Sequence, residues 1–221
     1  MTRVKICGVT TLDDALRCAE AGADLLGLNF YPPSPRYLPP DRARLLAAGL
    51  RSLLGTACPL LVGVFVNADA ATIRRILDEV GLDAAQLSGD EPPDTLAALD
   101  GRAYKALRPR DGVKAVENAR TFAAYAPRGE RLPALLVDAY HPQLYGGTGE
   151  QASEDVARAI TAVVPRLMLA GGLTPENVAA RVRAIRLWGV DVASGVERAP
   201  GVKDIERVRA FIAAVKSADQ E

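Results

Sequence analysis

The chain has 221 residues, 49% of them hydrophobic, which fits one large domain with a full core. Its 27 basic and 27 acidic residues cancel, and no apolar run is long enough to span a bilayer, so neither a nucleic-acid partner nor a membrane is expected. The three cysteines form no CxxC pair and there is one histidine, so we expect neither a disulfide framework nor a metal site.

Short β-branched and apolar runs alternate with longer amphipathic stretches along the chain. The predicted strands cover residues 4–7, 24–30, 60–66, 84–87, 103–107, 134–138, 167–170 and 190–193. Helices are predicted at about 12–19, 41–54, 73–80, 95–99, 113–125, after the glycine-rich stretch 146–149, from 175, and at 205–215. Continuously apolar strands are typical of a parallel sheet buried on both faces.

Eight strand–helix units favour a closed (β/α)₈ TIM barrel, an α/β fold, with residues 1–221 as a single domain. The alternative is an open doubly wound sheet, which usually has fewer strands and a switched strand order. No linker or shift in composition marks a second domain.

The active sites of such barrels lie where strands end and βα-loops begin. The predicted strands are apolar, but the residues at their carboxyl ends are polar or glycine. These residues are Cys7, Asn29, Asn67, Gln86, Ser88, Arg108, Asp138, Gly171, Gly172, Ser194 and Gly195. A purely structural barrel does not require this contrast, so we expect the site at this rim.

Cys7 and Asp138 are the candidate base and acid. A thiol has an ordinary pKa of about 8.5, and a nearby cation makes it a useful base. Lys5 lies two residues earlier, on the same side of the strand. The alternatives are a buried, inert Cys7 and a helix-capping Asp138. Strands one and six are expected on opposite sides of the ring, so that the two groups flank one substrate.

The turns after strands seven and eight are candidates for a phosphate site. Gly171-Gly172 and Ser194-Gly195 allow backbone amides to approach a phosphate closely. Barrels commonly bind phosphate at this place. The alternative is that these glycines only form tight turns, and that Lys203 in the next loop is a salt-bridge lysine.

Arg36 lies in the rigid, proline-rich loop 32–36. A guanidinium at a barrel mouth can hold a carboxylate through two hydrogen bonds. The proline frame favours such a role for Arg36 over that of a solvated surface arginine.

Several stretches together resemble one family. They are KICG at 5–8, GLNFYPPSPR at 27–36, VGVFVN at 62–67, Gln86-Leu87, Asp138, GGTG at 146–149, LAGGLTPENV at 169–178 and DVASGVERAPGVKD at 191–204. In this order they resemble phosphoribosylanthranilate isomerase of tryptophan biosynthesis, over nearly the whole chain.

The resemblance implies an Amadori rearrangement of N-(5-phosphoribosyl)anthranilate to 1-(2-carboxyphenylamino)-1-deoxyribulose 5-phosphate. Asp138 would protonate the furanose oxygen and open the ring to a Schiff base, and Cys7 would take the proton from C2. Arg36 would hold the anthranilate carboxylate, and amides of 171–172 and 194–195 would hold the phosphate. The partner is then a small sugar phosphate, with no cofactor and no metal.

The sequence departs from the family pattern in two places. Ser88 stands where the family usually has histidine, and residues 150–155 read EQASED where an aromatic group is common. Both places lie near the expected aryl end of the substrate. They bear on affinity for the aryl group and on whether loop 139–149 closes as a lid.

Three other functions are weighed. One is a histidine-pathway sugar-phosphate isomerase, which resembles this chain but has a carboxylate where Cys7 stands, so the thiol argues against it. A non-catalytic phosphate-binding barrel has support only from Ser88 and 150–155, and a thiamin-phosphate type barrel requires a pyrophosphate-binding set that is not found. Since no signal-peptide apolar segment follows Met1, we expect a cytoplasmic protein. It is expected to be a monomer or a homodimer.

Overall fold

The computed structural model describes residues 1–108, 112–138 and 154–220. The principal strands are β1 (Arg3–Cys7), β2 (Leu25–Asn29), β3 (Leu60–Phe65), β4 (Ala84–Leu87), β5 (Ala103–Leu107), β6 (Leu135–Val137), β7 (Leu167–Leu169) and β8 (Gly189–Val192). The helices are α1 (Leu12–Ala21), α2 (Pro40–Leu54), α3 (Ala70–Val80), α4 (Pro93–Ala98), α5 (Gly112–Ala123), α6 (Glu154–Thr161), α7 (Val178–Ile185) and α8 (Ile205–Ala218). A short 3-10 turn, η1 (Gly55–Ala57), follows α2, and η2 (Ser194–Val196) follows β8.

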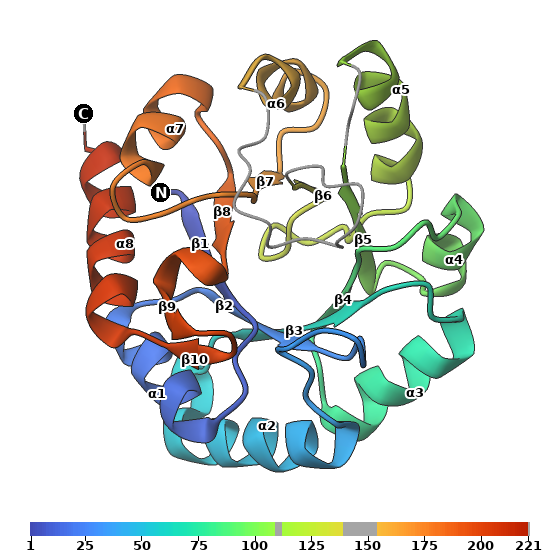
Figure 1. Ribbon diagram of the computed structural model, residues 1–221. Helices are drawn as coiled ribbons and strands as arrows, with labels where there is room; N and C mark the ends of the chain where they lie inside the picture. The colour runs from blue at the N-terminus through green and yellow to red at the C-terminus, as the bar shows by residue number, and fades with distance from the viewer. Residues whose placement is uncertain (109–111, 139–153, 221) are drawn as a thin grey trace.

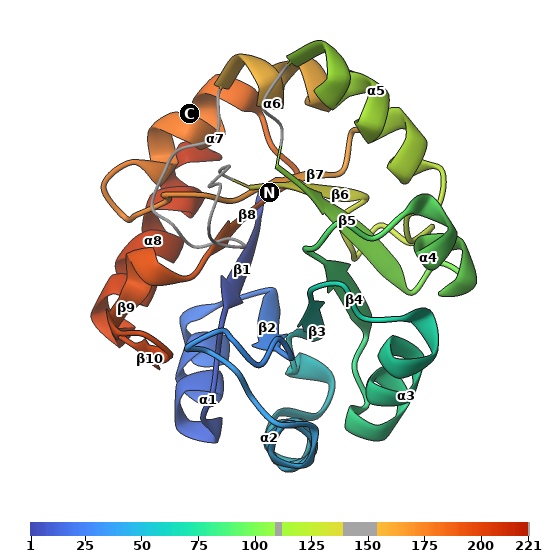
Figure 2. The same cartoon turned by 45° about the vertical axis from the view of Figure 1, so that its right-hand side comes forward.

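Strands β1 to β8 pair in parallel, in chain order, and form a closed barrel. The ring closes between the first and last strands, where Lys5 is in register with Asp191. Figure 1 shows the helices arranged around the outside of the strands, and Figure 2 shows the same arrangement turned by 45°. The predicted (β/α)₈ barrel is therefore confirmed, and the open doubly wound sheet is excluded.

The pleat of the strands divides the core into two parts. Alternate residues fill the barrel interior, among them Leu25, Val62, Tyr104, Leu136 and Met168. The residues between them pack outward against the helices and form the larger apolar layer. Because successive side chains of a strand point to opposite faces, this division fixes which strand-end residues face the mouth.

Local sequence sets the ends of several helices. The Thr11 hydroxyl accepts a hydrogen bond from the amide of Asp14 and caps the start of α1, and Asp69 and Asp204 cap α3 and α8 in the same way. Helix α1 ends at Gly22, whose φ of 102° lies in the left-handed region that favours glycine. These caps set where α1, α3 and α8 begin.

The structure differs from the predicted elements in two places. Helix α7 begins at Val178 rather than at 175, because Asn177 holds residues 172–177 in a turn through bonds with Gly172 and Thr174. An unpredicted antiparallel hairpin, β9 (Glu197–Ala199) and β10 (Val202–Lys203), follows η2. Among the described residues, no helix has the length and apolar character needed to cross a bilayer.

Candidate functional site

The two candidate catalytic residues stand at the carboxyl ends of two strands of the ring. Cys7 is the last residue of β1, and Asp138 directly follows β6, where its amide donates to the carbonyl of Leu107 at 2.9 Å. Both are partly buried. Each side chain lies on the same side of its strand as the residues that fill the barrel interior. Strands β6 and β1 are three steps apart around the ring, counted through β7 and β8. Directly opposite strands of an eight-strand ring are four steps apart, so the predicted opposite placement holds only approximately. The two side chains still flank one mouth.

A buried ion pair lies beneath the Cys7 thiol. The ammonium of Lys5, which is fully buried, donates to Oδ1 of Asp191 at 2.9 Å. Burial lowers the pKa of Lys5, but the charge and hydrogen bond of Asp191, together with the charges of Cys7 and Tyr104, outweigh this and hold the pKa above its ordinary value. Burial raises the pKa of the Cys7 thiol, and the cations of Lys5 and Lys203 act against that rise. The resting site therefore favours the thiol near neutral pH, with a fixed cation beside it to stabilise the thiolate.

Gly27, the β2 partner of Cys7 in register, leaves the space in which the thiol sits. A Cβ at this position would stand 2.7 Å from Sγ of Cys7 and 3.2 Å from Nζ of Lys5. Neither contact is tolerated without movement of the thiol or of the ammonium.

We expect Gly27→Ala to lower kcat by about 10- to 100-fold, because displacing the candidate base Cys7 by about 1 Å would cost rate on that scale. Steady-state kinetics with thermal unfolding curves would measure this. Gly129→Ala is the matched control, since a Cβ at Gly129 meets nothing within 4 Å. Full activity in a folded Gly27→Ala variant would contradict the placement of the thiol.

Arg36 lies beside Cys7, but one edge of its guanidinium is occupied. Nε and Nη2 donate to the carboxylate of Glu197 at 2.9 and 2.6 Å. The aliphatic stem of Arg36 crosses Gly8, where a side chain would collide with its Cδ. With a φ of 75°, Gly8 also adopts a conformation that favours glycine. The proposed carboxylate ligand is therefore held in place by a partner that sequence reasoning did not identify.

The two glycine-rich turns meet at one side of the mouth. Gly171 and Gly172 have φ values of 94° and 64°, in the left-handed region. A Cβ on Gly195 would collide with the carbonyl oxygen of Leu173, so the turns after β7 and β8 are in direct contact. Ser194 opens η2 at the same place. The structure thus brings together the four residues predicted to bind phosphate, between the strands that carry Asp138 and Cys7.

Lys203 is a salt-bridge lysine, which was the alternative considered for it. Its Nζ is completely buried, contacts Oε1 of Glu197 at 2.8 Å and also donates to the carbonyl oxygen of Cys7. It therefore supports the backbone of the thiol residue and is not available to hold a ligand phosphate.

The end of β4 forms a small polar network. Nε2 of Gln86 donates to the hydroxyl of Ser88 at 3.1 Å, and Oε1 of Gln86 accepts from the phenol of Tyr104 at 3.1 Å. Ser88 thus orients Gln86 rather than standing alone at the rim. The GGTG stretch, the predicted lid 139–149 and most of the departure at 150–155 lie outside the described residues.

Three residues of this site, Asp191, Tyr104 and Glu197, were not predicted from the sequence, and only one of them carried a usable signal. A charged residue inside the apolar β8 run, at Asp191, was a usable signal, because a buried carboxylate needs a partner. Tyr104 carried no comparable signal, since an aromatic residue within a strand is ordinary. Glu197 carried none either, because it follows a strand end by several residues.

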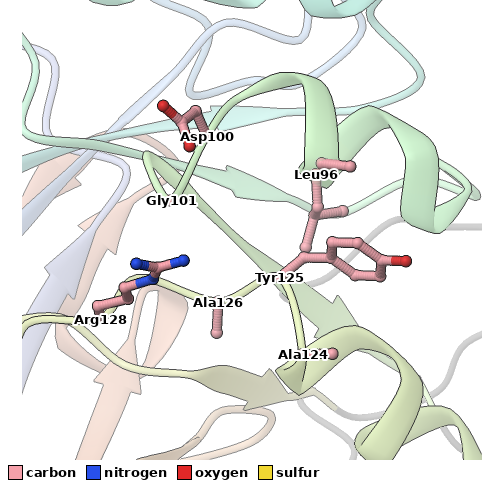
Figure 3. Close-up of a pocket in the computed structure, with 8 residues that line it drawn as sticks. Leu96, Asp100, Gly101, Ala124, Tyr125, Ala126 and Arg128 are labelled. Carbon is pink, nitrogen blue, oxygen red and sulfur yellow. The ribbon is translucent and has the colours of Figure 1, made fainter.

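A cavity of about 340 Å³ lies away from this site. Its lining comes from the end of α4 and the turn after it, and from the segment after α5, near the amino end of β5 (Figure 3); the residues are Leu96, Ala97, Asp100, Gly101, Ala124, Tyr125, Ala126 and Arg128. That end of a barrel usually serves stability rather than chemistry. Within the described ranges, no three His, Cys, Asp or Glu side chains gather as a metal-binding group.

The fold and the rim define a (β/α)₈-barrel enzyme, with a thiol, a carboxylate and two glycine turns at the carboxyl ends of β1, β6, β7 and β8. The N-(5′-phosphoribosyl)anthranilate (PRA) isomerase family matches residues 4–214. The chain belongs to this family.

Individual relatives agree with that assignment. The N-(5′-phosphoribosyl)anthranilate isomerase of Myxococcus xanthus is 48% identical over 215 residues, which cover 97% of this chain and 96% of that protein. The crystal structure of phosphoribosyl anthranilate isomerase from Thermus thermophilus has a TM-score of 0.81 at 36% identity, with 98% of this chain and 99% of that chain covered. A third structure is phosphoribosyl anthranilate isomerase in complex with reduced 1-(o-carboxyphenylamino)-1-deoxyribulose 5-phosphate. It has a TM-score of 0.78 at 33% identity, with 98% and 100% covered.

Proposed function

We propose that this chain isomerises N-(5′-phosphoribosyl)anthranilate to 1-(2-carboxyphenylamino)-1-deoxyribulose 5-phosphate, a step of tryptophan biosynthesis. The observation that carries the proposal is the order in which the candidate groups stand around the mouth of the barrel. The glycine turns after β7 and β8 stand between β6, which Asp138 directly follows, and β1, which ends at Cys7. A phosphate held at these turns places the sugar between an acid and a base. Membership of the family supports the same reaction.

In the proposed mechanism Asp138 donates a proton to the furanose ring oxygen. The bond from that oxygen to C1 breaks, and the nitrogen lone pair forms a C1–N double bond, which gives the open Schiff base. The Cys7 thiolate then takes the proton from C2, and the released electron pair forms the C1–C2 double bond of an enolamine. Tautomerisation moves the hydroxyl proton to C1 and leaves the ketone. Asp138 loses one proton and Cys7 gains one, so no oxidant, reductant or cofactor is consumed.

The charges around Cys7 suit its proposed task. Thiol burial makes the thiolate a stronger base, and Lys5 supplies the charge that allows the thiolate to exist. Lys5 is kept cationic by Asp191 at 2.9 Å, so it does not compete with Cys7 for the proton. The positively charged Schiff base makes the C2 proton more acidic. Its pKa then comes closer to that of a thiol, so a thiolate can accept this proton.

A turnover assay tests the proposed function. Phosphoribosylanthranilate is made in situ, and we expect the purified chain to remove the anthranilate fluorescence of this substrate. Expression in a tryptophan auxotroph that lacks this isomerase is expected to restore growth without tryptophan. A folded protein with no turnover that still binds the phosphate-bearing ligand would favour the non-catalytic phosphate-binding barrel instead.

The proposed ligand is a small sugar phosphate, and we propose a cytoplasmic enzyme that acts as a monomer or a homodimer. Light scattering after gel filtration distinguishes these two states. The net charge of zero supports the absence of a nucleic-acid partner.

A further inference from the structure

Glu197 and Lys203 of the β9–β10 hairpin form a buried ion cluster with Arg36, and the proposed acid–base steps do not use Glu197. The hairpin lies near α8 and α1 in both views of the ribbon (Figures 1 and 2). The carboxylate of Glu197 accepts hydrogen bonds from Arg36, from Nζ of Lys203 at 2.8 Å and from the amide of Gly201 at 3.3 Å. Both of its oxygens are therefore hydrogen-bonded.

The cluster holds two cations and one anion. Burial disfavours the ionised form of Glu197, but the hydrogen bonds and charges of Arg36 and Lys203 outweigh this and hold its pKa below the ordinary value. In the part of the chain that the structure describes, the ion pairs of both cations go to Glu197 alone, and a partly desolvated cation gains from a further anion. The side chain of Arg36 is 15% exposed, against 4% for Glu197 and none for Lys203, so an incoming anion reaches the cluster at Arg36.

The geometry leaves a defined edge of Arg36 for that anion. A guanidinium carries five N–H donors in a fixed plane. Glu197 occupies the edge that contains Nε, and the outer edge, with Nη1, is turned away from it. The stem cannot swing toward β1 because it already lies against Gly8.

We propose that Glu197 is a positioning residue, which holds Arg36 so that its outer edge meets the aryl carboxylate of the substrate. This inference rests on the proposed function and deepens it, because it takes Arg36 as the ligand of the anthranilate carboxylate, the role that the family resemblance implies for this residue. Glu197 itself touches no substrate atom. Through Lys203 the same carboxylate is tied to the carbonyl oxygen of Cys7, so it also fixes the bound aryl group relative to the thiol.

Calorimetric binding of two ligands tests the proposal without relying on turnover. One ligand is reduced 1-(o-carboxyphenylamino)-1-deoxyribulose 5-phosphate, and the other is the same compound without the carboxylate. The wild-type chain is expected to bind the first more tightly. Glu197→Gln keeps the side-chain size but removes the charge. We expect it to weaken the carboxylate ligand by about tenfold or more, and the other ligand by less than about threefold.

A double variant separates positioning from general structural support. If Glu197 acts through Arg36, then adding Glu197→Gln to Arg36→Ala has no further effect on the carboxylate ligand. Asp24→Asn is the matched control. It removes the carboxylate that Arg3 contacts at 2.6 Å, at the amino end of β2, and is expected to leave both affinities unchanged. If Glu197→Gln fails to fold, Glu197→Asp is used, with a smaller loss expected for the carboxylate ligand alone.

Three results would overturn the proposal while the proposed function stands, and the first two concern how the losses are distributed. These are an equal loss for both ligands in a folded variant, and additive losses in the double variant. A folded Glu197→Gln variant that retains the full carboxylate preference would do the same. A wild-type chain that binds neither ligand would instead refute the proposed function, and the positioning role with it.

Discussion

A Cys7→Ala variant is expected to lose at least about 10²-fold in kcat, because a positioned general base contributes about 10²–10⁴-fold to a proton transfer. The loss should fall on kcat rather than on ligand affinity, since the thiol is not part of the proposed phosphate or carboxylate contacts. Single-turnover kinetics and calorimetric binding of the reduced product analogue would separate the two quantities.

The pH profile distinguishes a base from a structural thiol. Burial raises the pKa of Cys7, so the thiolate fraction, and with it kcat/KM, is expected to rise as the pH increases above neutrality. Cys7→Asp places a carboxylate with an ordinary pKa of about 3.9 at this position, so its rising limb should move to lower pH. An unchanged profile in Cys7→Asp, or nearly full activity in Cys7→Ala, would remove Cys7 from the proposed role.

Asp138→Ala is expected to lower turnover by at least about 10²-fold as well, because ring opening then has no positioned proton donor. Asp138→Asn is the sharper variant, since it keeps the size and polarity and removes only the transferable proton. Both are expected to retain binding of the reduced product analogue, whose ring is already open. Steady-state kinetics and calorimetry measure the two effects.

A surface carboxylate provides the control for Asp138. Asp78 lies on α3 with a side chain 61% exposed, and Asp78→Asn is expected to leave kcat and KM unchanged. Retained turnover in a folded Asp138→Asn variant would show that another group donates the proton. Loss of binding together with turnover would show that Asp138 serves the ligand rather than the chemistry.

The strands and most helices could be predicted from the sequence because each carries its own burial pattern. Residues 84–87 and 103–107 form β4 and β5 with the predicted ends, since each short apolar run is buried on both faces. The start of α7 was predicted three residues early. Pro175 resembles a first helical residue, but the side chain of Asn177 stabilises a turn there instead.

The hairpin of β9 and β10 escaped prediction for a different reason. Strands of three and two residues are too short to show a period. Its main polar contact, from Arg36 to Glu197, joins residues 161 positions apart. A pattern within a short stretch of sequence cannot predict a contact between residues so far apart.

The sequence by itself determined the order of the elements and the chemical groups at the strand ends, so the thiol, the carboxylate and the glycine turns were predictable together. Only the tertiary structure decided what stands beside each group. Closure of the ring brings β8 against β1 and pairs Lys5 with Asp191, 186 positions away. The physical reason is that periodicity records how much of a residue is buried, whereas the partner of a buried charge depends on contacts between distant segments.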